Sequence, residues 1–73
     1  MDKRSTVSKK IGIRIAELRK DKGLTQEKLA EITHLNRTFV GYIEKGDRNP
    51  TNETLNKIAK ALDVSLSELF KFD

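Results

Sequence analysis

The chain has 73 residues, a formal net charge of +4 and no cysteine. This length fits one small domain, and the lack of cysteine excludes a disulfide framework and a cysteine-based metal site. Because His34 has no partners at metal-ligand spacing and no apolar run reaches roughly 18 residues, we expect a cytoplasmic single domain over residues 1–73 without metal, cofactor or membrane segment.

Basic residues gather at the N-terminus, where residues 1–22 hold eight Lys/Arg and three Asp/Glu. Two interpretations stay open: a phosphate-seeking arm, with residues 1–7 as a flexible basic extension, or a solvated helix face with a frayed tail. Next, Ile11, Ile15 and Leu18 recur at i, i+4 and i+7 and predict a first helix over about 8–22. Gly23 suits the left-handed residue that follows many helix ends.

Further along the chain, helix punctuation is frequent and no alternating strand pattern appears. Thr25 is suited to cap a second helix, and Asn36 a third that ends near Lys45, before Gly46. Pro50 and Thr51 begin a fourth helix, with an apolar inner face of Leu55, Ile58, Ala59 and Leu62. Ser65 to Glu68 matches the S-x-x-E capping box of a fifth, with Val64 and Leu69 placed as its hydrophobic staple. The sequence thus predicts an all-α fold of five short helices.

The second and third helices are joined by only a few residues, 33–35, which predicts a helix-turn-helix over about 25–45. On the third helix Val40 and Ile43 define a buried side. The side opposite is polar and small, with Thr38, Tyr42 and Lys45 next to Gly41. A mid-helix glycine costs roughly 1 kcal/mol relative to alanine. Such a surface suits close approach to a DNA major groove.

Ten residues are predicted to contact DNA: Thr25, Gln26, Asn36, Arg37, Thr38, Gly41, Tyr42, Lys45, Arg48 and Asn49. Among them, Gln26 is expected to hold a phosphate at a helix N-terminus, and Arg48 and Asn49 belong to a polar loop suited to the DNA backbone. Alternatives stay open for Arg37, as an ion-pair partner of Glu27 or Glu31, and for Tyr42, as cover for an apolar edge. For Phe39, packing within the protein and contact with DNA or with a dimer partner both stay open. Glu44 is expected to pair with a basic side chain inside the protein.

Leu24-Thr25-Gln26-Glu27, Ile43-Glu44, Arg48-Asn49-Pro50 and Ser65-Leu66-Ser67-Glu68-Leu69-Phe70 stand at the spacing of the lambda-repressor/Cro-like helix-turn-helix family, which the chain resembles from about residue 11 to 70. Asn36-Arg37-Thr38-Phe39 further resembles the controller proteins of restriction–modification systems. The resemblance implies a five-helix domain that binds short palindromic operators, generally as a dimer, without a small-molecule effector. His34 stands where the family has glycine, so either histidine adopts a positive φ there or the turn differs. Ile13 and Ile32 are expected at the surface.

The C-terminal segment carries more apolar side chains than a short terminal helix needs, namely Val64, Leu66, Leu69, Phe70 and Phe72. We expect a homodimer through Val64, Leu66, Leu69 and Phe70; the alternative is that they close the core of one protomer. The expected function is a non-enzymatic, DNA-binding transcriptional regulator, activating or repressing. The competing interpretation is an antitoxin-like or other protein-interaction module that uses Ile13, Ile32, Phe70 and Phe72.

Overall fold

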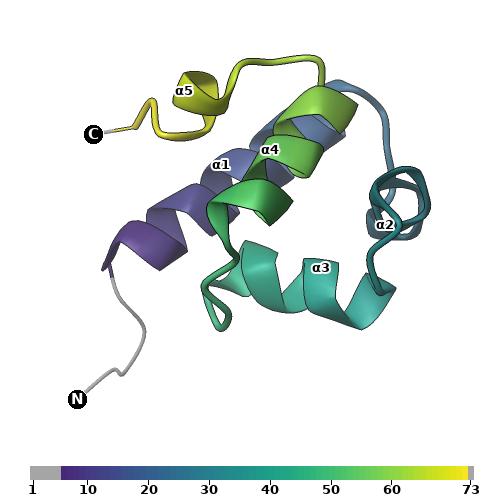
Figure 1. Ribbon diagram of the computed structural model, residues 1–73, viewed down its shortest axis with the longest axis horizontal. Helices are drawn as coiled ribbons and strands as arrows, with labels where there is room; N and C mark the ends of the chain where they lie inside the picture. The colour runs from purple at the N-terminus through teal and green to yellow at the C-terminus, as the bar shows by residue number, and fades with distance from the viewer. Residues whose placement is uncertain (1–5, 73) are drawn as a thin grey trace.

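The computed structural model describes residues 6–72, which form five helices (Figure 1). They are α1 (Thr6–Asp21), α2 (Gln26–Thr33), α3 (Arg37–Lys45), α4 (Asn52–Ala61) and α5 (Leu66–Leu69). Within residues 6–72 there is no strand, and the all-α prediction is confirmed. One boundary is wrong: residues 6 and 7, expected in a flexible arm, belong to α1. The rest of that expected arm, residues 1–5, lies outside the described residues.

Side-chain caps fix where the later helices begin. The Thr25 hydroxyl accepts a hydrogen bond from the Lys28 N–H at 3.0 Å, and the Asn36 side chain accepts one from the Thr38 N–H at 2.7 Å. Thr51 and Ser65 cap α4 and α5 in the same way. Each cap satisfies an N–H group that has no partner within its own helix. The caps predicted at Thr25, Asn36 and Ser65 are therefore confirmed.

Left-handed residues fix where helices end. Gly23 and Gly46 have φ of 72° and 80°, as predicted for residues that follow a helix. His34 has φ of 59°, so the turn between α2 and α3 keeps the left-handed geometry with a residue other than glycine. The departure at His34 therefore leaves the helix-turn-helix connection intact.

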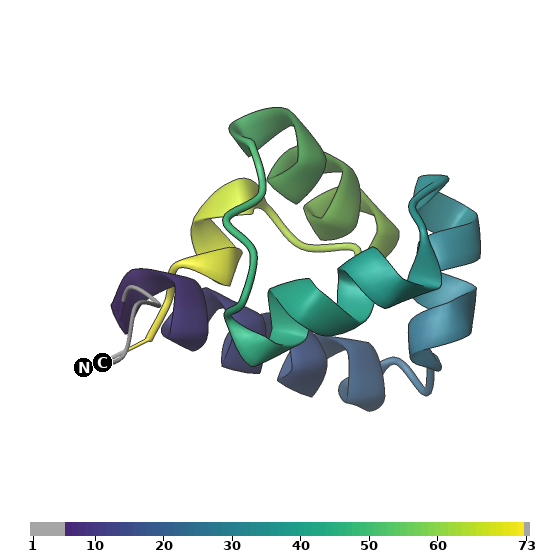
Figure 2. The ribbon, with the colours of Figure 1, turned by 90° about the horizontal axis from the view of Figure 1, so that it is seen from below.

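One core holds the helices together, and each helix contributes at least one fully or almost fully buried aliphatic side chain. Its members are Ile11, Ile15, Leu29, Ala30, Val40, Ile43, Leu55, Ile58, Ala59, Leu62 and Leu69. In Figure 2, α3 runs across the face nearest the viewer between α1 and α4. Helix α5 lies on the opposite side of the molecule from α3 in Figure 1. The core therefore leaves the outer side of α3 uncovered.

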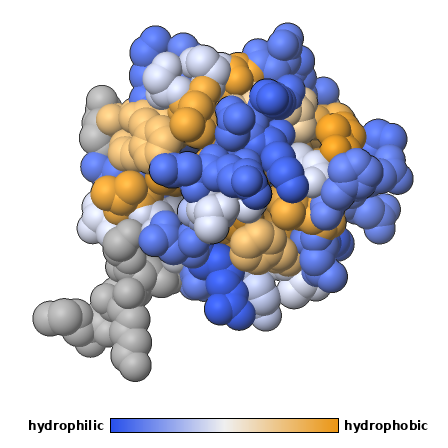
Figure 3. All heavy atoms as spheres, in the orientation of Figure 1, coloured by the Kyte–Doolittle hydropathy of each residue, from blue (hydrophilic) through white to orange (hydrophobic). Residues whose placement is uncertain are grey.

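Helix α5 is docked on α1 by Arg14, whose Nε donates to the Glu68 carbonyl oxygen at 3.0 Å and whose Nη2 lies 3.3 Å from the Glu68 carboxylate. Leu69 has no exposed surface. Our expectation of Leu69 at a dimer surface is therefore wrong, because its side chain fills the core of its own protomer. Val64 and Leu66 are half-buried against the same core. Phe70 is 42% exposed, and Figure 3 shows an apolar area over the position of α5.

Candidate nucleic-acid interface

The outer side of α3 carries the polar set that the sequence predicts. Val40 and Ile43 are each 1% exposed, so the helix is held by these two aliphatic residues. Arg37, Thr38, Tyr42 and Lys45 are exposed, and Gly41 between them is half-buried. The predicted division of α3 into a buried and an open side is therefore confirmed.

Side chains from α2 and α3 meet around a hollow of about 390 Å³. It is lined by six of the ten residues predicted for DNA contact: Gln26, Arg37, Thr38, Gly41, Tyr42 and Lys45. Gln26 is the first residue of α2, whereas the other five follow one side of α3. The fold thus joins the start of one helix to the outer side of the next in a single concave polar surface.

The space around Gly41 within the chain is large enough for a side chain. A Cβ built on Gly41 would meet only the Gln26 Oε1, at 3.8 Å, which is an ordinary contact. Gly46 differs, because it combines a positive φ with a Cβ position 2.8 Å from Lys9 Cα. The packing of the chain itself therefore does not require glycine at position 41.

A buried ion pair fixes α3 to the rest of the domain. Arg19 Nε and Nη2 donate to the two oxygens of Glu44 at 2.7 and 3.1 Å, with side chains only 10% and 6% exposed. Arg19 Nη1 also donates to the Leu24 carbonyl oxygen at 2.7 Å. The prediction that Glu44 pairs internally with a basic side chain is confirmed. Glu44 also accepts a hydrogen bond from Gln26 Nε2 at 2.9 Å, so the pair reaches the edge of the hollow.

The four other predicted contact residues do not line the hollow and have other partners. The Arg48 guanidinium stands over the Tyr42 ring, 5.3 Å from its centroid, which brings the loop after α3 to the hollow. Asn49 turns toward α1, where its Oδ1 accepts from the Ser8 hydroxyl at 3.5 Å. The side chains of Thr25 and Asn36 serve as the caps of α2 and α3. Within residues 6–72, Arg37 takes part in no ion pair, so the pairing with Glu27 or Glu31 is not formed.

Another exposed ion pair lies on α2, where Lys28 Nζ is 2.7 Å from Glu31 Oε1. This hydrogen bond and the attraction between the charges raise the pKa of Lys28 and lower the pKa of Glu31. The charge of Lys28 is thus balanced locally. The cationic side chains that line the hollow itself are Arg37 and Lys45.

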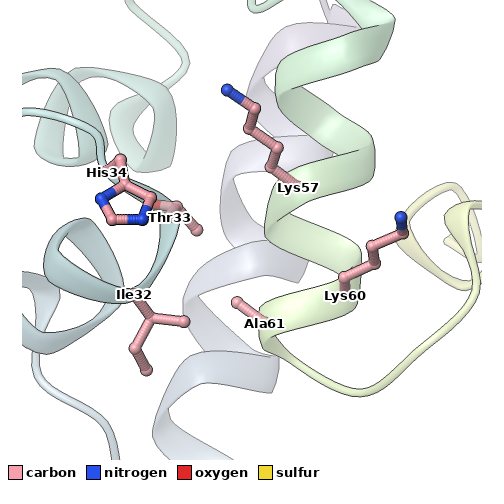
Figure 4. A pocket seen from close by; sticks show the side chains of 6 residues that line it. All are labelled: Ile32, Thr33, His34, Lys57, Lys60 and Ala61. Atoms are coloured by element: carbon pink, nitrogen blue, oxygen red, sulfur yellow. The ribbon is translucent and has the colours of Figure 1, made fainter.

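A separate hollow of about 350 Å³ lies between α2 and α4. In Figure 4, Ile32 of α2 and Ala61 of α4 face each other across it, and Lys57 and His34 stand at one end. It contains none of the residues predicted for DNA contact. Ile32 is 44% exposed here, and Ile13 on α1 is 57% exposed, as predicted for both.

Sequence reasoning missed two residues of α1 that position α3: Gly12 and Arg19. A Cβ on Gly12 would overlap the Ile43 carbonyl oxygen and lie 2.6 Å from that of Glu44, so α1 and α3 meet backbone to backbone there. The sequence does contain a pattern that could have identified Arg19. It continues the Ile11, Ile15 stripe at the next i+4 position, where a charged residue has to be buried and therefore needs a partner.

Known proteins are similar to this chain in sequence and in fold. A profile of the helix-turn-helix family matches residues 15–69. The chain is 42% identical to the control protein C.MunI of Mycoplasma sp over 62 residues, which are 84% of this chain and 84% of that protein. It is 50% identical to the control protein C.SmaI of Serratia marcescens over 46 residues, which are 63% of this chain and 55% of that protein.

Among solved structures, the restriction-modification controller protein C.AhdI from Aeromonas hydrophila matches with a TM-score of 0.85 and 46% identity, over 86% of this chain and 96% of that one. Within residues 6–72, no helix has both the length and the apolarity needed to cross a bilayer. The predicted resemblance to restriction–modification controller proteins is confirmed. The profile covers most of the chain, and the chain therefore belongs to the helix-turn-helix family.

Proposed function

We propose that this protein is a sequence-specific DNA-binding transcriptional regulator of the cytoplasm, acting as the controller of a restriction–modification system. One observation carries the proposal: the side of α3 opposite Val40 and Ile43 forms, with Gln26, a polar hollow that contains the cations Arg37 and Lys45. Relatives named as control proteins support the same assignment.

The proposed mechanism places the outer side of α3 in the major groove. Arginine pairs in bidentate fashion with the O6 and N7 of guanine, and a threonine methyl group fits against that of thymine, which suits Arg37 and Thr38. Arg48, stacked on Tyr42, lies where the edge of the groove would bring a phosphate. Glycine at 41 lets the helix backbone approach the base edges.

We further propose that two copies bind a palindromic operator. A helix of nine residues reads only a few base pairs, and a two-fold dimer doubles that number with half-sites about 34–36 Å apart. Phe70, exposed on the side of the molecule away from α3, is the centre of the proposed dimer surface, with Val64 and Leu66 at its edge.

A footprint on the DNA immediately upstream of the coding region for this protein tests the proposal. We expect a protected, two-fold symmetric site and an affinity whose logarithm falls steeply with the logarithm of salt concentration, because several phosphates lose counterions. Absence of protection there and on a pool of random duplexes would refute DNA binding.

The competing function, a protein-interaction module, is favoured by the exposed Ile13 and Ile32. An apolar protein interface depends little on salt, so the two functions differ in the same measurement.

A further inference from the structure

Chemistry fixes the orientation of the Gln26 amide. The Glu44 carboxylate is almost fully buried and receives Arg19 Nε at 2.7 Å, Arg19 Nη2 at 3.1 Å and Gln26 at 2.9 Å. An ionised carboxylate only accepts hydrogen bonds, so Gln26 has to present its NH₂ group to Glu44. The opposite orientation would set two acceptor oxygens against each other in a place shielded from water.

The other end of the amide consequently faces outward. Gln26 Oε1 is the nearest atom to the position that a Cβ on Gly41 would occupy, 3.8 Å away, and both residues line the hollow. Arg37 and Lys45 in that lining can only donate hydrogen bonds, whereas a carbonyl oxygen can only accept. The hollow therefore holds an acceptor fixed by Glu44, Gln26 Oε1, beside two cationic donors and the hydroxyl groups of Thr38 and Tyr42, which can donate or accept.

A phosphate oxygen is itself an acceptor, so it can bond only to the second N–H of the Gln26 amide and not to Gln26 Oε1. In the major groove, the donors are the exocyclic amino groups, N6 of adenine and N4 of cytosine. We propose that Gln26 is a specificity-determining residue whose Oε1 accepts a hydrogen bond from such an amino group, in place of the phosphate contact expected from the position of Gln26 in α2. This inference rests on the proposed DNA-binding function.

Glu44 acts as the positioning residue. Because Glu44 belongs to α3, its hydrogen bond ties the amide of α2 to the helix that carries Arg37 and Thr38. Arg19 holds Glu44 from α1 and also holds the Leu24 carbonyl oxygen in the segment before α2. Gln26 Oε1 and the side chains of α3 are thus held in a fixed position relative to each other and face the same groove.

The test begins with duplexes selected from a random pool by the full chain, which give its preferred site. Gln26→Ala leaves both Arg19 contacts to Glu44 in place, and Asn56→Ala, an exposed amide on α4, is the matched control. In the same selection, the Gln26→Ala variant should lose its preference at one base pair. Its affinity should fall about tenfold on the preferred site, the discrimination of one base-edge contact, and scarcely change on random duplex. Asn56→Ala should match wild type on both.

A second arm alters the DNA, so the result does not depend on how a variant folds. At the base pair assigned to Gln26, adenine or cytosine is replaced by the same base without its amino group. Wild type should lose about tenfold and Gln26→Ala should lose nothing further. The identity of the selected base decides between adenine N6 and cytosine N4.

An equal loss on preferred and random duplexes, or an unchanged affinity on both, would overturn the inference, since the first identifies a phosphate contact and the second no contact. Full wild-type affinity for DNA without the amino group would overturn it as well. If wild type binds no duplex in the pool, the proposed function fails first, and that outcome is distinct from these.

Discussion

Gly12 of α1 lies directly against the backbone of Glu44 in α3, and a Cβ at position 12 would stand 2.6 Å from the Glu44 carbonyl oxygen. Real Cβ atoms do not come so close to a backbone oxygen, so any larger residue has to push the two helices apart. Helix α3 is therefore positioned from α1 by a glycine as well as by the Arg19–Glu44 ion pair.

Gly12→Ala should consequently destabilise the protein. Overpacking costs about 1–3 kcal/mol or more, and this exceeds the gain of roughly 0.5–1 kcal/mol that alanine brings to a helix. The free energy of unfolding, measured in urea, checks this. A variant as stable as wild type would show that α1 and α3 do not meet at Gly12.

Gly41→Ala is the matched substitution with the opposite expected result. The added Cβ has room within the chain, so we expect unfolding free energy to rise by roughly 0.5–1 kcal/mol. DNA affinity should nevertheless fall, because the methyl group occupies the approach to Gln26 Oε1. Chemical denaturation and fluorescence anisotropy on one preparation measure both. Tight binding by Gly41→Leu with a normal fold would refute the close-approach argument.

Arg37→Ala should relax base preference. We expect a loss of roughly 1–3 kcal/mol on the preferred duplex and a much smaller loss on random DNA, since a base contact carries specificity and a phosphate contact does not. Competition binding with both duplexes provides the ratio. Equal losses on the two would identify Arg37 as a phosphate contact.

Glu44→Ala should be among the most damaging changes to stability. Removing one partner of a buried ion pair leaves the other charge uncompensated and costs about 3–5 kcal/mol. Glu31→Ala is the control, because its pair with Lys28 is exposed to solvent and its loss should leave unfolding almost unchanged. Urea unfolding of the two variants tests the contrast, which would be refuted by similar values.

Phe70→Lys should yield a folded monomer that has lost most operator affinity. Ile32→Lys is matched in charge and in exposure, 44% against 42%, but lies in the hollow between α2 and α4. It should therefore remain dimeric. Sedimentation at micromolar concentration without DNA makes the comparison. A wild-type species of 8.3 kDa would refute the dimer outright.

The sequence by itself determined the helices and which side of α3 is buried, because both follow from interactions between residues close together in the chain. A cap depends on residues two or three positions away, as Asn36 and Thr38 show. The burial of Val40 and Ile43 follows from helical periodicity alone. Five of the ten predicted contact residues lie along one side of α3 for the same reason, and the fold adds Gln26 from α2.

Only the tertiary structure decided how residues far apart in the chain meet. Leu69 has the same apolar character as its exposed neighbour Phe70, and the docking of α5 on α1 is what separates them. Nothing next to Gly12 in the sequence requires glycine there, and the requirement comes from the backbone of α3 packed against it. The Gln26 amide has two equivalent orientations in the sequence, and a carboxylate 18 positions further along selects one of them. These features depend on contacts between residues far apart in the chain, and the periodicity of a single helix does not predict such contacts.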